Sequence, residues 1–152
     1  MPRILPCLWF DDSIAEAVEF YCDVFKDAEI RNMQRMPDGK VFTATFRLRD
    51  QEFMALNGGP LFPFTEAVSF FVSCADQAEV DYFWEKFTTN GGTESRCGWL
   101  KDRFGLSWQI VPQALPNLIG GPDRVAAGRA MQAMLKMRKI DVAALEAAYA
   151  GP

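Results

Sequence analysis

The same order of elements occurs twice within this 152-residue chain. In each half a short apolar strand is followed by an amphipathic helix and then by further strands. A shift of 62 residues places Val18-Glu19-Phe20-Tyr21 on Val80-Asp81-Tyr82-Phe83 and Phe25 on Phe87. An internal repeat of this length indicates one supersecondary unit used more than once. The sequence therefore predicts two copies of a βαβββ module.

The first copy occupies about residues 1–60. Residues 4–10 form an apolar run typical of a buried strand, and Ser13-x-x-Glu16 then offers a capping box for a helix that ends near Lys26–Asp27. Segments 29–36 and 40–48 flank the turn signal Pro37-Asp38-Gly39, and 51–57 completes the set. We expect three strands after the helix.

The second copy occupies about residues 61–116. Residues 67–73 form its first strand, and Asp76 with Glu79 can cap a helix that Asn90-Gly91-Gly92 ends. A strand is expected near 93–97. The segment CGWLKDRFGLSWQIVP, Cys97 to Pro112, then supplies the last strands.

The remaining residues, about 117–152, are helical in pattern. One helix begins at Pro122-Asp123, and a second begins at Asp141, with Ile140 and Leu145 placed as a hydrophobic staple. These helices are apolar enough that they must pack on the sheet or on another subunit. The predicted fold class is α+β, with residues 1–152 as a single domain.

Composition excludes several classes of function. The net charge of −4 and the absence of a cluster of Lys or Arg argue against nucleic acid or an anionic membrane as partner. The N-terminal apolar run stops at Asp11, too soon for a signal peptide, and no run is long enough to span a membrane, so we expect a cytoplasmic protein. The four cysteines lack metal-type spacing and are interpreted as buried thiols. The chain has no histidine, the usual general base and metal ligand.

The segment Cys97–Pro112, together with LPCLWFDD near the start and AMLKMRKIDVAALEAAYAG near the end, resembles the PhnB-like family. That family belongs to the glyoxalase/bleomycin-resistance, or vicinal oxygen chelate, superfamily and often carries the label 3-demethylubiquinone-9 3-methyltransferase. The resemblance implies paired βαβββ modules that form a curled mixed sheet around a cavity, and a homodimer.

Metal-binding members of the superfamily carry His, Gln or Glu at four points. The resemblance places these points near Pro6 (or Leu5), Ala55, Ala67 and Gln109. Only Gln109 is polar, and one neutral amide cannot hold a divalent cation. We therefore expect no metal. The glycine pairs do not open an apolar helix after a strand, as a nucleotide-type methyl donor would need, so we expect no cofactor.

Candidate ligand-binding residues come from the aromatic and amide side chains of the strands. Trp9, Trp99, Phe104 and Trp108 either line the cavity or pack against the helices. Gln109 alternates with Trp108, so one of the two faces the cavity. Asn57 is a further candidate, or else it caps the Gly58-Gly59 turn.

Arg103 lies in the predicted turn between Asp102 and Gly105. It either contacts an acidic group of a substrate or plays a structural part. Two functions stay open at this stage: a metal-free protein that binds a small organic molecule, and an enzyme acting on a small polar or aromatic substrate. The missing metal ligands favour binding.

Overall fold

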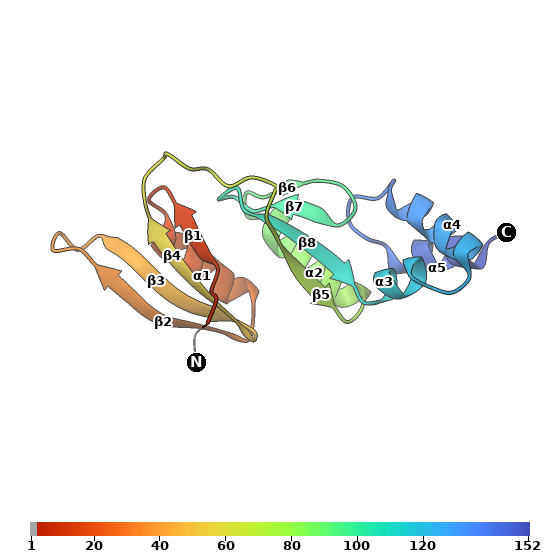
Figure 1. Ribbon diagram of the computed structural model, residues 1–152, viewed down its shortest axis with the longest axis horizontal. Coiled ribbons are helices and arrows are strands. Elements are labelled where there is room, and N and C mark those ends of the chain that lie inside the picture. Colours follow the sequence, from red (N-terminus) through yellow and green to blue (C-terminus); the bar gives the residue numbers. More distant parts are fainter. Residues whose placement is uncertain (1–2) are drawn as a thin grey trace. The chain divides into compact units, whose positions relative to one another are not determined.

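The computed structural model describes residues 3–152 and divides the chain into two compact units, Met1–Phe64 and Thr65–Pro152. Each unit contains one four-stranded mixed sheet and one helix packed on it (Figure 1). The strand orders are β1-β4-β3-β2 and β5-β8-β7-β6, which is the same topology twice. The predicted α+β fold with two βαβββ modules is confirmed, and each module forms an open sheet of its own.

The first unit consists of β1 (Cys7–Phe10), α1 (Ile14–Val24), β2 (Ala28–Arg35), β3 (Val41–Leu48) and β4 (Gln51–Asn57). The helix places its apolar stripe on one face of the sheet, with Tyr21 fully buried against Phe46 at 6.2 Å between ring centroids. Phe46 in turn stacks on Phe53 at 5.2 Å. An apolar face on each element is what closes this small core.

The start of α1 differs from the capping box expected at Ser13. The Ser13 side chain makes no capping hydrogen bond. Instead the Asn57 side chain, at the end of β4, accepts a hydrogen bond from the Ile14 backbone nitrogen at 3.1 Å. The first turn of a helix leaves backbone N–H groups without partners inside the helix, and any well-placed oxygen can satisfy them. Here a residue distant in sequence takes that place.

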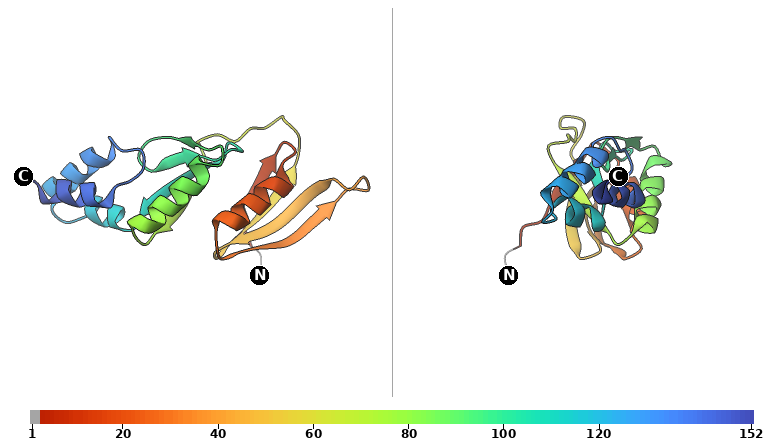
Figure 2. Two further views of the ribbon diagram at one scale, coloured as in Figure 1. Left: turned by 180° about the vertical axis from the view of Figure 1, so that it is seen from behind. Right: turned by 90° about the vertical axis from the view of Figure 1, so that its right-hand side faces the viewer.

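The second unit begins with β5 (Ser69–Cys74), α2 (Gln77–Thr88), β6 (Thr93–Glu94), β7 (Trp99–Lys101) and β8 (Ser107–Pro112). The predicted cap of α2 is confirmed: the Asp76 carboxylate accepts from the Glu79 nitrogen at 3.0 Å. The buried residues of α2 form one apolar stripe and comprise Val80, Phe83, Trp84 and Phe87. In the left-hand view of Figure 2, which shows the molecule from behind, α2 lies in front of this sheet.

Two strands of the second sheet are much shorter than their counterparts. β6 has two residues and β7 has three, whereas β2 and β3 have eight each. The strand expected near 93–97 ends at Glu94, because Cys97 and Gly98 adopt left-handed backbone angles, φ 57° and 84°. Cys97 pays a steric penalty in that region that Gly98 avoids.

The tail adds α3 (Ala114–Ile119), α4 (Arg124–Met134) and α5 (Val142–Ala150) to the second unit. The short α3 was not expected from the sequence. The predicted starts of the two longer helices are confirmed, since Asp123 and Asp141 both accept hydrogen bonds from the first turns. The predicted staple is present as a buried cluster, formed by Val111, Leu115, Ile140 and Leu145.

Residues 137–142 fasten this tail to the module. The backbone nitrogens of Cys97 and Gly98 donate to the carbonyls of Met137 and Arg138 at 2.9 and 2.8 Å. The Gln77 amide donates to the Ile140 carbonyl at 3.0 Å and accepts from the Val142 nitrogen at 2.7 Å. The tail is thus an integral part of the second unit.

Two ion pairs reinforce the same attachment. Lys139 pairs with Asp81 at 2.8 Å and lowers the pKa of that carboxyl. The indole of Trp84 donates to Glu94 at 2.8 Å and is the main cause of the lowered pKa of Glu94, to which Arg138 adds a weaker contact at 3.5 Å. Both carboxylates are therefore stabilised in their charged form.

The interpretation of all four cysteines as buried thiols is wrong. Cys74 is buried, Cys22 and Cys97 are half-buried, and Cys7 is exposed. Cys7 faces away from α1 because it is the first residue of β1, on the side of the strand that the helix does not cover. No helix within residues 3–152 combines the length and apolar character needed to cross a membrane.

Candidate functional site

The register of the second sheet decides which side chains share its uncovered face. Gln109 pairs with Phe71 on one side and with Trp99 on the other. Side chains of directly paired residues lie on the same face, and neighbours along a strand lie on opposite faces. Phe71, Gln109 and Trp99 therefore form a row on the face opposite to Trp108.

Trp108 lies on the face covered by α2. It is 3% exposed and stacks on Phe87 of that helix at 5.0 Å between centroids. Its indole nitrogen donates to the Asp102 carboxylate at 2.9 Å. Trp108 is thus a core residue of the second unit, and the amide of Gln109 is the member of the pair that faces away from the helix.

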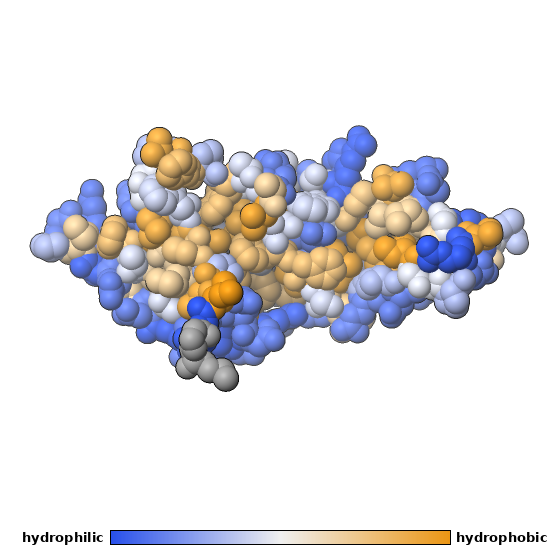
Figure 3. Space-filling view, in the orientation of Figure 1, coloured by the Kyte–Doolittle hydropathy of each residue, from blue (hydrophilic) through white to orange (hydrophobic). Residues whose placement is uncertain are grey.

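The row of Phe71, Gln109 and Trp99 borders a pocket of about 240 Å³. The sheet supplies one side of it, and the tail helices α3 and α4 supply the other through Leu115, Ile119 and Met134. Figure 3, drawn in the orientation of Figure 1, shows apolar side chains gathered over these strands and the adjoining helices. Its lining is aromatic or aliphatic except for Gln109 and the thiol of Cys97.

Gln109 is the stronger hydrogen-bonding group of the two polar residues in the pocket lining. Its Nε2 donates to the Ser69 hydroxyl at 2.9 Å, which fixes the side chain along the sheet. Within residues 3–152 the Oε1 atom has no hydrogen-bond partner, and one N–H of the amide is also unused. A carboxamide can accept two hydrogen bonds and donate two, so most of this capacity stays available.

Asp102 organises the turn that precedes β8, a role that goes beyond the predicted turn position. Its Oδ1 accepts from the backbone nitrogens of Phe104 and Leu106 at 2.9 and 3.0 Å, and its Oδ2 accepts from Trp108. The side chain is 3% exposed. Gly105 has φ 88°, as the turn requires. The spacing Asp102-x-Phe104-Gly105 indicates the turn in the sequence, and the structure adds the hydrogen bond that Asp102 accepts from Trp108.

The same turn carries Arg103 and Phe104, both outside the pocket described above. Arg103 is exposed, and its guanidinium lies 4.8 Å from the centroid of the Phe104 ring. A cation over an aromatic face at this distance is mildly attractive. Neither Arg103 nor Phe104 belongs to the residues that line the pocket with Gln109.

The two candidates of the first unit, Trp9 and Asn57, make internal contacts there. The indole nitrogen of Trp9 donates to the Gly59 carbonyl at 2.9 Å, and its ring meets Phe62 edge-on at 5.1 Å. Asn57 accepts from Ile14 and also donates to the Val41 carbonyl at 3.0 Å. The Asn57 amide thereby ties β3 and α1 to β4, and the Gly58-Gly59 turn does not use it.

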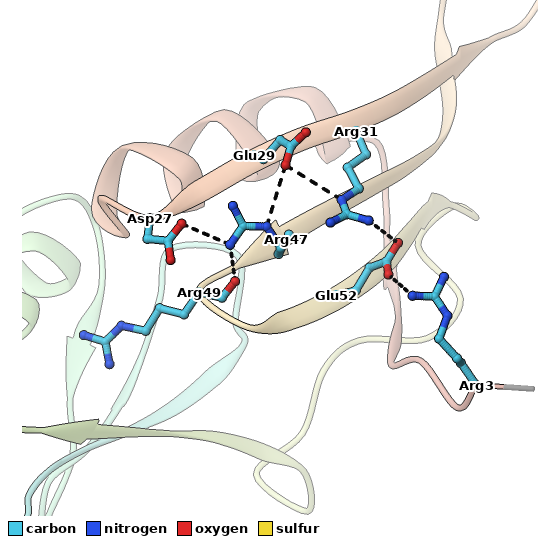
Figure 4. A network of polar contacts seen from close by, with 7 residues as sticks. All are labelled: Arg3, Asp27, Glu29, Arg31, Arg47, Arg49 and Glu52. Carbon is cyan, nitrogen blue, oxygen red and sulfur yellow. Dashed lines mark hydrogen bonds and ion pairs between the residues drawn. The ribbon is translucent and has the colours of Figure 1, made fainter. Parts of the chain in front are cut away.

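Charged side chains cover another part of the first unit (Figure 4). Arg47 pairs with Asp27 at 3.0 Å and with Glu29 at 3.7 Å, and Asp27 is the main cause of its raised pKa. A second set links Glu52 to Arg3 at 2.6 Å and to Arg31 at 3.6 Å. Arg3, Arg31 and Arg47 thus each pair with a carboxylate of the same unit.

The model of the 3-demethylubiquinone-9 3-methyltransferase family matches residues 2–111. The chain belongs to this family. Among solved structures, the PhnB protein from Bacillus cereus is 31% identical, with a TM-score of 0.68 and an alignment covering 73% of this chain and 99% of that one. No curated protein matches the chain.

More distant structures share the fold of the family. A protein from Pseudomonas aeruginosa is 18% identical, with a TM-score of 0.61 and coverage of 74% of this chain and 98% of that chain. The fosfomycin resistance protein FosX from Listeria monocytogenes, solved with Mn(II) and sulfate, is 14% identical, with a TM-score of 0.53 and coverage of 70% and 88%. These likenesses show that the chain shares its fold with both proteins.

FosX was solved with Mn(II), and the residues of this chain can be tested for their fit to such an ion. The positions expected for metal ligands hold Pro6, Ala55, Ala67 and Gln109, of which only the amide could donate to a cation. Over the described part of the chain, no three or more His, Cys, Asp or Glu side chains gather as a metal site would require. The residues present do not fit a divalent ion, which needs several anionic or imidazole ligands.

The family match covers only part of the pocket lining. The match ends at residue 111, so the strand residues Phe71, Trp99 and Gln109 lie within it. The tail residues Leu115 and Met134 lie beyond it.

Proposed function

We propose that this protein binds a small aromatic molecule carrying an O–H or N–H group in the pocket beside Gln109, without a metal ion. The observation that carries the proposal is the unpaired Gln109 Oε1 in an otherwise apolar pocket. Pockets of this composition bind through apolar contact, while a few polar groups fix the orientation of the ligand.

The size of the pocket limits the ligand. Sites for drug-sized molecules occupy roughly 300–1,000 Å³, and this pocket holds about 240 Å³. One or two fused rings fit that space. Trp99 and Phe71 offer ring faces or edges for stacking, which adds about 0.5–1.5 kcal/mol per aromatic pair beyond burial alone.

Gln109 supplies the specificity. Because Ser69 already accepts from one N–H of the amide, a ligand that donates a hydrogen bond to Oε1 completes the arrangement. A ligand without a donor would bury that oxygen unpaired, at a cost of about 1–3 kcal/mol. The proposal therefore predicts preference for phenols over the corresponding hydrocarbons.

Isothermal titration calorimetry with 1-naphthol and naphthalene tests the proposal. We expect 1-naphthol to bind with Kd on the order of 0.1 mM, assuming about 0.5 kcal/mol for each non-hydrogen atom. Naphthalene should bind at least about fivefold more weakly. In Gln109→Leu this preference should disappear, while in the matched control Gln132→Leu, an exposed position of α4, it should persist. Absence of 1-naphthol binding to the wild-type protein would contradict the proposal.

We also infer a homodimer in which the uncovered sheet faces are partly buried. Phe71 is 57% exposed and Met54 is 40% exposed, so each of these faces presents a large apolar side chain. Sedimentation velocity should give twice the mass of the 17.1 kDa chain. Met54→Lys should shift the protein toward the monomer, and Val125→Lys on α4 should not. A monomeric wild-type protein would exclude the dimer.

A further inference from the structure

We propose that the C-terminal tail sets the upper size of the ligand, with Met134 and Ile119 as the specificity-determining side chains. This inference rests on the proposed function, because it concerns the same pocket. It goes further in assigning the size limit to a segment that lies beyond the family match.

The pocket has two walls of different origin. The sheet wall comes from Phe71 on β5, Trp99 on β7 and Gln109 on β8. The opposite wall comes from Leu115 and Ile119 at α3 and from Met134 at the end of α4. Because α2 covers the opposite face of the sheet, the side of the pocket that faces this row is supplied by the tail.

The second wall is held in place by contacts away from the pocket. Ile140 and Leu145 are fully buried in the cluster beneath it, and Met134 and Ile119 pack against that cluster. Gln77 and the backbone of Cys97 and Gly98 fix the chain that leads into α5. A wall supported in this way has a defined distance from Gln109, which is what size selection requires.

Met134 is the part of the wall that a substitution can change with least damage. It is half-buried at the last residue of α4. Methionine fills irregular space with a flexible, unbranched side chain, so its truncation to Ala opens the pocket while the helix is retained. Ile119, at the last residue of α3, offers a second truncation in the same wall.

A series of three phenols tests the inference by calorimetry: phenol, 1-naphthol and 4-phenylphenol. They share one hydroxyl donor and differ in size. Wild-type protein should bind 1-naphthol most tightly and 4-phenylphenol weakly. In Met134→Ala the affinity for 4-phenylphenol relative to 1-naphthol should rise about tenfold, the scale on which apolar pockets discriminate size.

Met131→Ala is the matched control, because Met131 lies on the same helix, 37% exposed and outside the pocket lining. It should leave the ranking of the three phenols unchanged. Ile119→Ala should shift the ranking in the same direction as Met134→Ala, and thermal melting of each variant confirms that it is folded.

The possible failures are separable. If wild-type protein binds none of the three phenols, the proposed function is overturned, and this inference falls with it. If wild-type protein binds 1-naphthol but Met134→Ala and Ile119→Ala rank the phenols as Met131→Ala does, only the role of the tail is overturned. Tightest binding of 4-phenylphenol by wild-type protein would likewise exclude a size limit set by the tail.

Discussion

The two modules share one topology but use their uncovered sheet faces differently. The shift of 62 residues that relates the repeats places Trp9 on Phe71, and each aromatic side chain has a paired neighbour in the last strand of its module. In the first module that neighbour is Leu56, and in the second it is Gln109. The same place on the scaffold is thus apolar in one copy and polar in the other.

The carboxamide of the first module, that of Asn57, lies outside that row and makes structural hydrogen bonds. The amide of Asn57, one residue beyond Leu56, accepts a hydrogen bond from the Ile14 nitrogen and donates one to the Val41 carbonyl. The amide of Gln109 donates only one hydrogen bond, to the Ser69 hydroxyl. A repeat can therefore keep its fold while the amide of one copy holds strands and helix together and the amide of the other retains unused hydrogen-bonding capacity.

The largest effect is expected at the turns that precede the last strand of each module. Asp102→Ala removes a buried acceptor of three hydrogen bonds and should lower the free energy of unfolding by about 3–5 kcal/mol. Asp50→Ala, in the corresponding turn of the first module, removes an exposed side chain and should cost less than about 0.5 kcal/mol. Urea denaturation measures both, and equal effects would refute the structural role of Asp102.

The two amides give the next contrast. Asn57→Ala leaves the Ile14 nitrogen and the Val41 carbonyl without their side-chain partner, and should destabilise the protein by about 1–2 kcal/mol. Gln109→Ala should cost less than about 1 kcal/mol, because one hydrogen bond is lost at a half-buried site. Urea midpoints and 1-naphthol titrations should rank the two variants in opposite orders. A larger loss of stability in Gln109→Ala would break the comparison.

The smallest expected effect is the loss of stability at low pH in the region where the tail is attached. The pKa values of Asp81 and Glu94 are lowered in the folded protein, chiefly by Lys139 and by Trp84 respectively. Their contribution to stability is therefore complete above the usual values of 3.8 and 4.5 and is lost as the pH falls through the lower folded values. Both groups are substantially exposed, so the loss is small.

Hydrogen exchange resolves this effect by region. As the pH falls through the lowered pKa values of Asp81 and Glu94, the amide of Gly98, which donates to Arg138, should lose protection, while the amide of Ile14 in the first module should not. Lys139→Met should reduce the difference between neutral and acid pH at Gly98. Equal loss of protection at both amides would indicate general unfolding instead.

Local patterns in the sequence were sufficient for much of this fold. Capping residues such as Asp76, Asp123 and Asp141 act within a few residues, so their roles could be predicted. The cap of α1 could not, because Asn57 lies 43 residues from Ile14. The short helix α3 was also missed, since Pro116 within it weakens any helical pattern.

The candidate site was predictable only as a set of alternatives. The alternation of Trp108 and Gln109 shows that they face opposite ways, but only the position of α2 decides which way each one points. The contribution of Met134 and Ile119 depends on the path of the tail, which bends back at residues 137–140 through contacts with Cys97 and Gly98. No short-range signal encodes that return.

The same return has a consequence for the order of folding during synthesis. The left-handed turn at Cys97 and Gly98 is completed by carbonyls about forty residues further along the chain. The N-terminal part of a chain emerges from the ribosome first, and domains tend to fold as they emerge. The first module can close its core while the second is still being translated. The turn of the second module stays incomplete until Met137 and Arg138 have emerged.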